Sequence, residues 1–426
     1  MSEILDGREE RSFLIKKSFR GFPLLVIKAN TPGPEKKPPW AHFLVDYFRN
    51  LVSEIFQAIQ EEFYENADGF FWIIEIQKSE NIKEKLIEIE EKHPLGRLID
   101  LDLFLSDESS ISRKKLNLPL RNCLLCQEPA IVCIRNKAHS LFDLSNRIKE
   151  IILDFLCDNI YILLDEAITL EAKVHPKFGL VTKKSSGSHP DMNFALMMEA
   201  KKAIIPPFIE IFKTAYSKGF ETAYQEARRI GLEAEKAMYQ STGGVNAYKG
   251  LIFVLGLVLV SLGNSFQEYR FDLFSKIKKL GRELNKDFLD QKLETGGLIA
   301  YRKYGITGIR GEVMKGLPNV RKVLPRLNDF SRKNILMSLI DLIRDVEDTV
   351  LLKRAGSLEK YQYYRNLIGN IKTFDEAKIY EITAECIENN LSFGGSADLL
   401  IVTIFLKKVE GCLKLNYESN LSDRSL

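Results

Sequence analysis

The sequence EAKVHPKFGLVTKKSSGSHPDMNF, residues 171–194, organises the helical part of the chain, yet its two glycines and two prolines prevent it from being one regular element. Its charged and titratable residues are His175, His189, Glu171, Asp191, Lys173, Lys177, Lys183 and Lys184. Pro190 and Asp191 suit the first turn of a following helix. Because ordering a long charged loop costs conformational entropy, we favour an anion site here over a merely solvated loop.

Helical periodicity dominates the chain from residue 158 onward and predicts an all-α domain over 158–426. The expected helices cover 158–172, 191–215, 220–239, 247–263, 267–290, 330–353, 357–371, 374–389 and 397–411. The helix that follows the opening stretch is expected to be interrupted at Pro206 and Pro207. The longest apolar run, 251–263, is shorter than the roughly 20 residues of a membrane span, so it predicts a buried helix.

The first 157 residues show a different pattern, in which strands alternate with helices. Strands are expected at 23–29, 70–77, 97–105 and 130–134, and helices at 40–65, 80–92 and 139–157. This alternation predicts a mixed α/β or α+β sheet domain, so the whole chain belongs to the α+β class with a larger all-α domain at its end. No hinge composition marks the junction, and we expect a near-continuous helix there.

Bulk composition excludes several classes. The 426 residues are 45 % hydrophobic and 28 % charged, which is typical of a globular chain with two domains. A net charge of +3 is too balanced for a nucleic-acid binder. The N-terminal sequence has no signal-peptide pattern, and six cysteines without a signal indicate a reducing compartment, so we expect a cytoplasmic protein.

Two acids in GRLIDLDLF predict a metal site. Asp100 and Asp102 are two residues apart in a strand, so both face the same side, about 7 Å apart. Their mutual repulsion favours a bound cation, and Mg²⁺ commonly combines one or two carboxylates with substrate phosphates. Arg97 is placed to hold a phosphate oxygen. The alternative is a strand edge with two solvated acids.

A second metal motif lies in RNCLLCQEPAIVCIRNKAHS. Cys123, Cys126, Cys133 and His139 have the spacing C-x2-C-x6-C-x5-H. Three thiolates and an imidazole suit tetrahedral Zn²⁺. The alternative is a hairpin whose cysteines pack as small hydrophobic side chains.

Glycine pairs open two apolar helices of the all-α domain. STGGVNAYKG supplies Gly243, Gly244, Asn246 and Lys249, and NLSFGGSADLL supplies Gly394, Gly395, Ser396 and Asp398. Glycine lets a backbone approach a ligand closely, and a helix N-terminus favours an anion. Asn246 and Ser396 are also ordinary N-cap residues. Two such loops and the opening stretch together favour a polyphosphate site.

Three more polar residues are candidates. Arg310 and Glu312 lie among the glycines of GITGIRGEVMKG, and Asp348 is expected late in a helix, where the helix dipole disfavours an acid. A solvated helix face explains Asp348 equally well. Because the sequence has no P-loop, dinucleotide-binding glycine motif or nucleophile elbow, a nucleotide would bind in an unusual all-helical site.

The part from residue 158 onward resembles triphosphoribosyl-dephospho-CoA synthase of the citrate lyase prosthetic-group pathway. The matching stretches are PKFGLV, GSHPDMNF, TGGVN with KG, GE with GLP, DT at 348–349, and NLSFGGSADLL. The family usually has Asp, His and Asn where this chain has Thr182, Tyr248 and Val350. It usually has Pro at Phe178 and Phe393, and Gly at Ala355.

Residues 1–157 resemble holo-citrate-lyase synthase, the transferase that loads this group onto the acyl carrier subunit. The matching stretches are REER at 8–11, PGP near residue 33, GRLIDLDLF and the Cys-x2-Cys to His139 run. The resemblance implies a nucleotidyltransferase-like domain, and the whole chain resembles the fused bifunctional form.

The resemblance implies two reactions. The 2′-hydroxyl of 3′-dephospho-CoA attacks C1 of the ATP ribose and expels adenine; a serine of the acyl carrier (gamma) subunit then attacks the product and releases pyrophosphate. For the first reaction we assign the general base to Asp191 or Asp398, keep Glu171 and Asp348 as further catalytic candidates, and assign phosphate contacts to Lys177, Lys249 and Arg310. For the second we assign Mg²⁺ to Asp100 and Asp102.

Two other interpretations remain at this stage. One is the parallel pathway of malonate decarboxylase, which uses the same cofactor. The other is a non-catalytic, zinc-stapled scaffold, which the departures at Thr182, Tyr248 and Val350 would suit. No membrane or nucleic-acid partner is expected.

Overall fold

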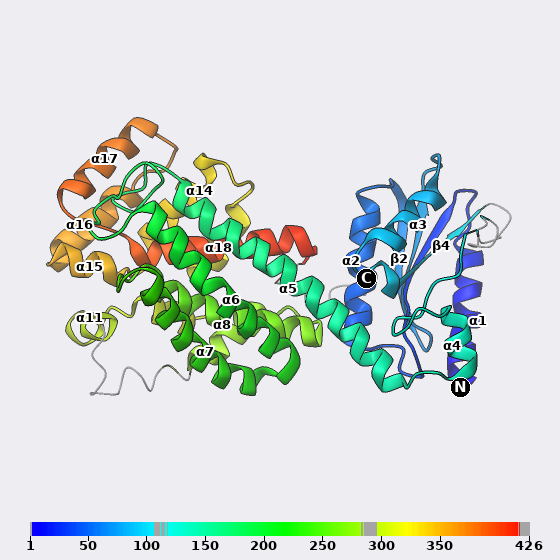
Figure 1. Ribbon diagram of the computed structural model, residues 1–426. Helices are drawn as coiled ribbons and strands as arrows, with labels where there is room; N and C mark the ends of the chain where they lie inside the picture. The colour runs from blue at the N-terminus through cyan, green and yellow to red at the C-terminus, as the bar shows by residue number, and fades with distance from the viewer. Residues whose placement is uncertain are drawn as a thin grey trace. The chain divides into compact units, whose positions relative to one another are not determined.

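The computed structural model describes residues 2–105, 111, 116, 118–282, 284, 296–415 and 417. Contacts divide the chain into two compact units, Met1–Leu156 and Cys157–Leu426 (Figure 1). Helix α5, Leu141–Lys173, runs through this division without a break, which confirms the expected near-continuous helix.

The first unit contains a four-stranded sheet in which every pair is antiparallel. Its strands are β1 Leu24–Ala29, β2 Ala58–Asn66, β3 Gly69–Ile76 and β4 Ile99–Phe104, in the order β2-β3-β1-β4. The α+β class is therefore confirmed in coarse terms, and the sheet has no parallel pair among the described residues. The expected helix over 40–65 is wrong in its second half, because β2 is a half-buried edge strand whose Gln and Glu residues favour helix locally.

Helices cover the two faces of this sheet. Helix α2, Pro39–Ser53, packs on β1 and β3, and α3, Ile82–Lys92, packs along β4. Helix α1, Ser2–Lys17, covers the opposite face, where Ile15 packs with Leu24, Val26, Phe71 and Ile73. A short 3-10 helix, η1 Gly96–Leu98, leads into β4.

The predicted strand at 130–134 is wrong: helix α4, Ala130–Asn136, occupies this segment. Pro129, with φ −55°, precedes the helix and fixes the backbone at its start. Its apolar residues Ile131, Val132 and Ile134 are exposed, so no buried sheet face draws them into a strand. Tertiary context here outweighs the β-branched composition.

The second unit consists of helices in its described residues. After α5 these are α6 Phe194–Lys218, α7 Phe220–Ser241, α8 Lys249–Glu268, α9 Leu273–Arg282, α11 Gly296–Tyr304, α12 Gly308–Met314, α13 Pro318–Val323, η3 Leu324–Arg326, α14 Arg332–Asp345, α15 Thr349–Ala355, α16 Leu358–Gly369, α17 Glu376–Glu388 and α18 Gly394–Leu413. The predicted all-α character is confirmed for these residues.

Helix α8 forms the centre of this unit and packs against α6, α7, α9 and α18 (Figure 1). It is long and apolar enough to cross a membrane by composition, but 83 % of its most apolar window is buried inside the protein, as predicted. Pro206 and Pro207 do not interrupt α6, contrary to expectation. The packing of α6 against α7 and α8 offsets the hydrogen bonds that the two prolines remove.

Candidate functional site

The loop that follows α5 is fixed against the turn between α17 and α18. Ser188 Oγ donates to the carbonyl oxygen of Leu391 at 2.6 Å, and the backbone N–H of Phe178 donates to Thr383 Oγ1 at 3.1 Å. His189 Nε2 lies 2.9 Å from Ser392 Oγ. These contacts join segments about 200 residues apart, so two of the predicted ligand-binding stretches meet.

Arg354, at the end of α15, is the cation of this meeting point and was not identified from the sequence. Its guanidinium donates to the backbone oxygens of Ser188 and Asn390 at 3.0 and 3.1 Å. It also donates to Nδ1 of His189 at 3.1 Å, which leaves the proton of a neutral imidazole on Nε2, facing Ser392. Burial, with the Arg354 charge second, lowers the pKa of His189 to about 4. His189 is therefore neutral at pH 7, and the positive charge belongs to Arg354.

Glu171 and Lys177 form a buried ion pair beneath this loop. Lys177 Nζ lies 2.5 Å from Glu171 Oε1 and donates to the Glu171 backbone oxygen at 2.7 Å. The side chain of Lys177 is 1 % exposed and that of Glu171 is 2 % exposed. Burial lowers the pKa of Lys177, and Glu171 opposes that effect. Lys177 was predicted to hold phosphate, but its ammonium is occupied inside the protein.

Asp398, on the first turns of α18, lies against the start of α8. A Cβ atom built on Gly250 would stand 2.1 Å from Asp398 Oδ2, so glycine is required for this approach. No hydrogen bond or ion pair satisfies the Asp398 carboxylate among the residues that the structure describes. Burial, followed by the charges of Asp348 and Glu171, raises the pKa of Asp398 well above its ordinary value.

Tyr248 immediately precedes α8 and is a second unsatisfied group beside these acids. Its side chain is 2 % exposed, and its hydroxyl has no hydrogen-bond partner among the described residues. Burial and the charges of Glu171 and Asp398 raise its pKa. Tyr248 and Asp398 thus lie beside the buried pair of Glu171 and Lys177.

Asp348 is not late in a helix, as the sequence had suggested, but is the N-cap of α15. Oδ1 accepts the backbone N–H groups of Val350 and Leu351, at 2.9 and 3.1 Å. Oδ2 accepts the backbone N–H and the hydroxyl of Ser396, at 2.8 and 3.0 Å. The chain turns at Val346, which is extended, so the predicted helix 330–353 is two helices. Asp348 joins the starts of α15 and α18.

The glycine loop before α8 is placed differently from the one before α18. Gly243 and Gly244 have positive φ values of 64° and 93° in the turn after α7. Asn246 Oδ1 accepts the backbone N–H of Lys249 at 3.1 Å. The ammonium of Lys249 lies 2.8 Å from Glu235 Oε2 and is half-exposed. Gly394 and Gly395 begin α18 itself, and the Asp348 carboxylate lies close to Gly395.

Three predicted site residues of the second unit remain: Arg310, Glu312 and Asp191. Arg310 lies over Phe253 of α8, 5.7 Å from the ring centre. The preceding residue, Ile309, places its Cδ1 atom 3.2 Å from where a Cβ on Gly250 would stand. Glu312 instead accepts from the backbone and side chain of Asn319, which makes it a support for the start of α13. Asp191 is exposed, and its charge acts on His189 and Arg354.

In the first unit, Asp100 and Asp102 face the same side of β4. Asp100 pairs across the sheet with Lys28, and its Oδ1 lies 2.6 Å from the guanidinium of Arg121. Among the described residues, no hydrogen bond or ion pair satisfies Asp102. Burial, reinforced by the Asp100 charge, raises the pKa of Asp102. The guanidinium of Arg97 donates to the backbone oxygen of Asn122.

A group of cations beside these acids was not assigned from the sequence. Asp68 is fully buried and pairs with Arg8, Arg11 and Lys28, at 3.3, 3.1 and 3.2 Å. Three positive charges around one carboxylate leave an excess that suits phosphate oxygens. The REER motif at residues 8–11 supplies Arg8 and Arg11, but their partner Asp68 lies 60 and 57 residues further along the chain.

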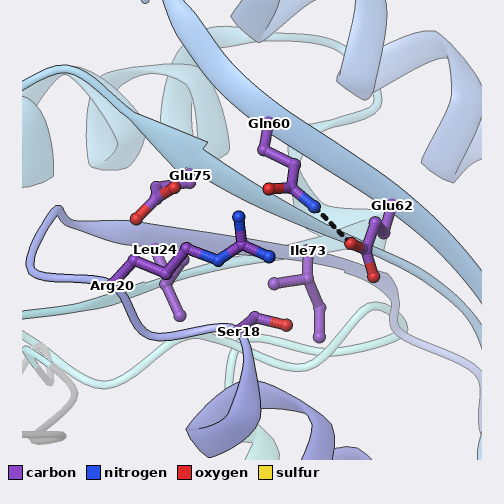
Figure 2. A pocket seen from close by; sticks show the side chains of 7 residues that line it. All are labelled: Ser18, Arg20, Leu24, Gln60, Glu62, Ile73 and Glu75. Carbon is purple, nitrogen blue, oxygen red and sulfur yellow. Dashed lines mark hydrogen bonds between the residues drawn. The ribbon is translucent and has the colours of Figure 1, made fainter.

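A small, open pocket lies on the sheet face that carries Asp100 and Asp102, at the other end of β1 (Figure 2). The side chains that line it are Ser18, Arg20, Leu24, Gln60, Glu62, Ile73 and Glu75. Leu24 pairs with Phe104, whereas Lys28 pairs with Asp100, so the pocket and the acid pair are separated along the strands. Two carboxylates against one guanidinium make this pocket less suited to phosphate than the cations around Asp68.

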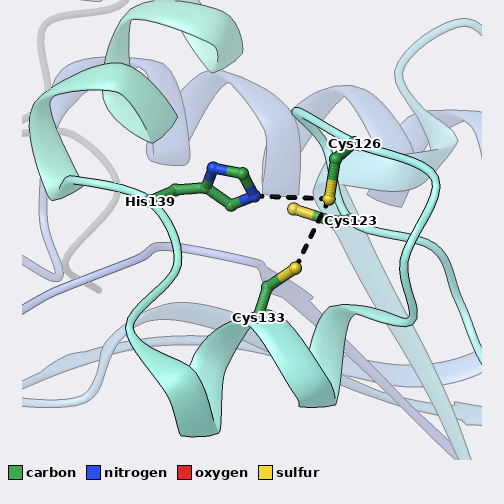
Figure 3. A group of neighbouring side chains, drawn as sticks. All are labelled: Cys123, Cys126, Cys133 and His139. Carbon is green, nitrogen blue, oxygen red and sulfur yellow. Dashed lines mark hydrogen bonds between the residues drawn. The ribbon is translucent and has the colours of Figure 1, made fainter.

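The predicted zinc ligands come together. Cys123, Cys126, Cys133 and His139 offer donor atoms that all lie within 4.8 Å of one another (Figure 3). Cys123 and Cys126 lie in the turn that the Asn122–Pro129 bridge closes, as the hairpin alternative expects, whereas Cys133 comes from helix α4 and His139 from the turn before α5.

Comparison with known proteins also divides the chain near residue 156, as the two structural units do. The family model described as ATP:dephospho-CoA triphosphoribosyl transferase (CitG) matches residues 157–416. The model described as apo-citrate lyase phosphoribosyl-dephospho-CoA transferase (CitX) matches residues 1–155. The chain is 30 % identical to protein CitXG of Leuconostoc mesenteroides subsp. cremoris, over 97 % of this chain and 98 % of that protein.

Two further relatives show the same relationship. Protein CitXG of Haemophilus influenzae is 30 % identical over 96 % of both chains. The 2-(5''-triphosphoribosyl)-3'-dephosphocoenzyme-A synthase of Haemophilus ducreyi is 30 % identical, over 68 % of this chain and 100 % of that protein.

Proposed function

This chain belongs to the CitG and CitX transferase families, which act in the synthesis and attachment of the citrate lyase prosthetic group, and we propose that each unit carries one of the two reactions. Residues 158–426 join ATP to 3′-dephospho-CoA and release adenine. Residues 1–157 transfer the phosphoribosyl-dephospho-CoA group to a serine of the acyl carrier protein and release pyrophosphate. The observation that carries the proposal is the Asp398 carboxylate, which is unsatisfied among the described residues and lies against Gly250.

Asp398 is the best candidate for the general base of the first reaction. A base must accept the proton of the 2′-hydroxyl as the new bond to ribose C1 forms and the bond to adenine breaks. Its raised pKa makes it a stronger base than an exposed aspartate. The other acids are less suitable, because Glu171 is paired with Lys177, Asp348 is an N-cap and Asp191 is exposed.

Substrate phosphates require cations that remain accessible. Lys177 is unsuitable because its ammonium is buried against Glu171. Arg310, over Phe253 of α8, and Arg354, beside His189, are less buried than Lys177 and are the candidates. The half-exposed Lys249 can exchange its surface partner for a phosphate.

Adenine release measures the first reaction directly. Asp398→Asn is expected to reduce release from ATP and 3′-dephospho-CoA by about 10²- to 10⁴-fold, the usual contribution of a general base. Asp191→Asn is the matched control, since this acid is exposed. Full activity of Asp398→Asn would remove Asp398 from the mechanism, and loss in Asp191→Asn alone would transfer the role to Asp191.

The acid pair and the cations around Asp68 support the second reaction. Asp102 and Asp100 would hold Mg²⁺, whose charge would neutralise substrate phosphates, and the unsatisfied state of Asp102 among the described residues fits such an ion. Arg8, Arg11 and Lys28 would contact the triphosphate. Asp102→Ala should lose loading of the carrier protein by at least about tenfold while adenine release continues.

The carrier protein decides between the two pathways that use this cofactor. We propose the gamma subunit of citrate lyase, because the chain matches the apo-citrate lyase transferase family over residues 1–155. Loading of that subunit, compared with the carrier subunit of malonate decarboxylase under the same conditions, tests this choice. We also propose the cytoplasm as the site of action, because the six cysteines are free thiols, which a reducing compartment maintains.

A further inference from the structure

The Cys/His cluster, formed by Cys123, Cys126, Cys133 and His139, has the donors and spacing of a tetrahedral metal site (Figure 3). Cys126 Sγ lies 3.4 Å from Cys133 Sγ and 3.3 Å from His139 Nε2. Tetrahedral zinc, with bonds of about 2.0–2.3 Å, separates neighbouring donors by about 3.3–3.8 Å. A disulfide would need about 2.05 Å, and the cysteines are free.

The backbone of the C-x2-C turn is arranged for a bound thiolate. The N–H of Leu125 points to Cys123 Sγ at 3.5 Å, and the N–H of Cys123 donates to the oxygen of Glu128 at 2.8 Å. Asn122 and Pro129 form a bridge that closes the turn. Such outer contacts orient metal ligands and stabilise their charge.

Helix α4 has little else to hold it in place. Within α4, all of which is described, Cys133 is the buried residue, while Ile131, Val132 and Ile134 are 43 %, 39 % and 74 % exposed. A helix of seven residues is not stable by itself in water. Since these apolar side chains are exposed, Cys133 is the side chain through which a bound metal would fix α4.

The same loop supplies a contact to the acid pair. Arg121, two residues before Cys123, reaches Asp100 Oδ1 and Glu90 Oε1, both at 2.6 Å. Its backbone oxygen accepts the N–H of Ala130, the first residue of α4, at 2.9 Å. The loop is thus fixed at one end by the Cys/His cluster and joined at the other to Asp100.

We propose that the Cys/His cluster binds one Zn²⁺, and that this ion positions Arg121 against Asp100. Three sulfurs and one imidazole nitrogen fill four coordination positions, which is typical of a structural rather than a catalytic zinc. The ion touches no substrate. Arg121 is a positioning residue that acts through Asp100, and this second half of the proposal rests on the proposed attachment reaction.

Metal content tests the binding half. The full-length chain, purified under reducing conditions, should contain one zinc by elemental mass spectrometry. Cys133→Ser should lose it, and Cys412→Ser, which changes a cysteine outside the cluster, should retain it. Replacement with Co²⁺ should give the intense absorption of tetrahedral cobalt thiolate. A metal-free protein that also gives no such absorption with Co²⁺ would overturn the site.

Separate assays of the two reactions test the positioning half. Arg121→Ala should keep zinc and release adenine normally, but load the carrier protein about 10- to 100-fold more slowly, the usual effect of losing an outer-shell partner. Cys133→Ser should show the same selective loss; its adenine release verifies that the second unit is folded, and its far-ultraviolet circular dichroism, compared with that of Cys412→Ser, verifies that the first unit keeps its secondary structure. Normal loading by Arg121→Ala would disprove the positioning role. If the unmodified chain loads no carrier protein, the proposed attachment function fails instead, while the zinc measurement still stands.

Discussion

The carboxylate of Asp398 occupies the space that any side chain at position 250 would need: a Cβ on Gly250 would stand 2.1 Å from Asp398 Oδ2. The start of α8 and the start of α18 therefore meet without an intervening side chain. Both helices are among the most buried of the second unit. Their rigid packing holds an unsatisfied acid at a fixed place, which is what a catalytic base requires.

Gly250→Ala should displace Asp398 and reduce adenine release by about a hundredfold, since a misplacement of about 1 Å can have that effect. Gly256→Ala, on the same helix, is the matched control, because its Cβ would meet Ile211 Cδ1 at an ordinary 3.6 Å. Steady-state adenine release measures both. Equal activity of the two variants would show that the contact is unimportant for the reaction.

The pH dependence of the first reaction should report on Asp398. Because burial raises its pKa, the rate of adenine release should rise with pH through a value well above the ordinary 3.8 of aspartate. An ordinary aspartate would give a flat profile above about pH 5. Stability should change in the opposite direction: the folded state favours the protonated acid, so ionisation at higher pH destabilises it.

Asp398→Asn removes that ionisation. Thermal unfolding should therefore show a midpoint gain over the unmodified chain that grows from about pH 4 to pH 8. A gain that stays constant across this range would mean that Asp398 ionises as freely in the folded protein as in the unfolded one.

Asp348→Ala should destabilise the second unit by about 2–4 kcal/mol, because it removes an N-cap and leaves buried donors of Ser396 without an acceptor. Chemical denaturation of the full-length chain measures this loss. Combining it with Ser396→Ala should cost less than the sum of the single changes. Strict additivity would show that the two residues do not act as a pair.

His189 should make the protein sensitive to acid. Its folded pKa, about 4, is below the ordinary 6.5, so the unfolded chain binds its proton first as the pH falls. The free energy of unfolding should decrease between about pH 6.5 and 4. His189→Gln lacks this titration, and its stability deficit should shrink over that range. A deficit that is constant with pH would place the acid sensitivity elsewhere.

Several local signals could be interpreted from the sequence because they depend on neighbouring residues. The apolar, β-branched runs of β1, β3 and β4 and the apolar stretch of α8 identified their own elements. The spacing of Cys123, Cys126, Cys133 and His139 identified a cluster that the structure brings together. The strand geometry of Asp100 and Asp102 placed them on one face.

Other features depended on partners far away in the chain. Asp348 continued a helical pattern in the sequence, but its bonds to Ser396, 48 residues later, make it a junction between two helices. Arg354 gave no local signal, because its partners lie at 188–189 and 390. Lys177 belonged to a charged loop, yet the fold buries it against Glu171.

The sequence alone therefore determined the division into an α+β part and a helical part, and the families to which they are similar, because periodicity and motif spacing are local properties. Tertiary structure decided which charges are free to act. Hydrogen bonds to Ser396, 48 residues away, satisfy Asp348, and an ion pair that the fold buries satisfies Lys177 and Glu171. Asp398, packed against Gly250, has no partner among the described residues.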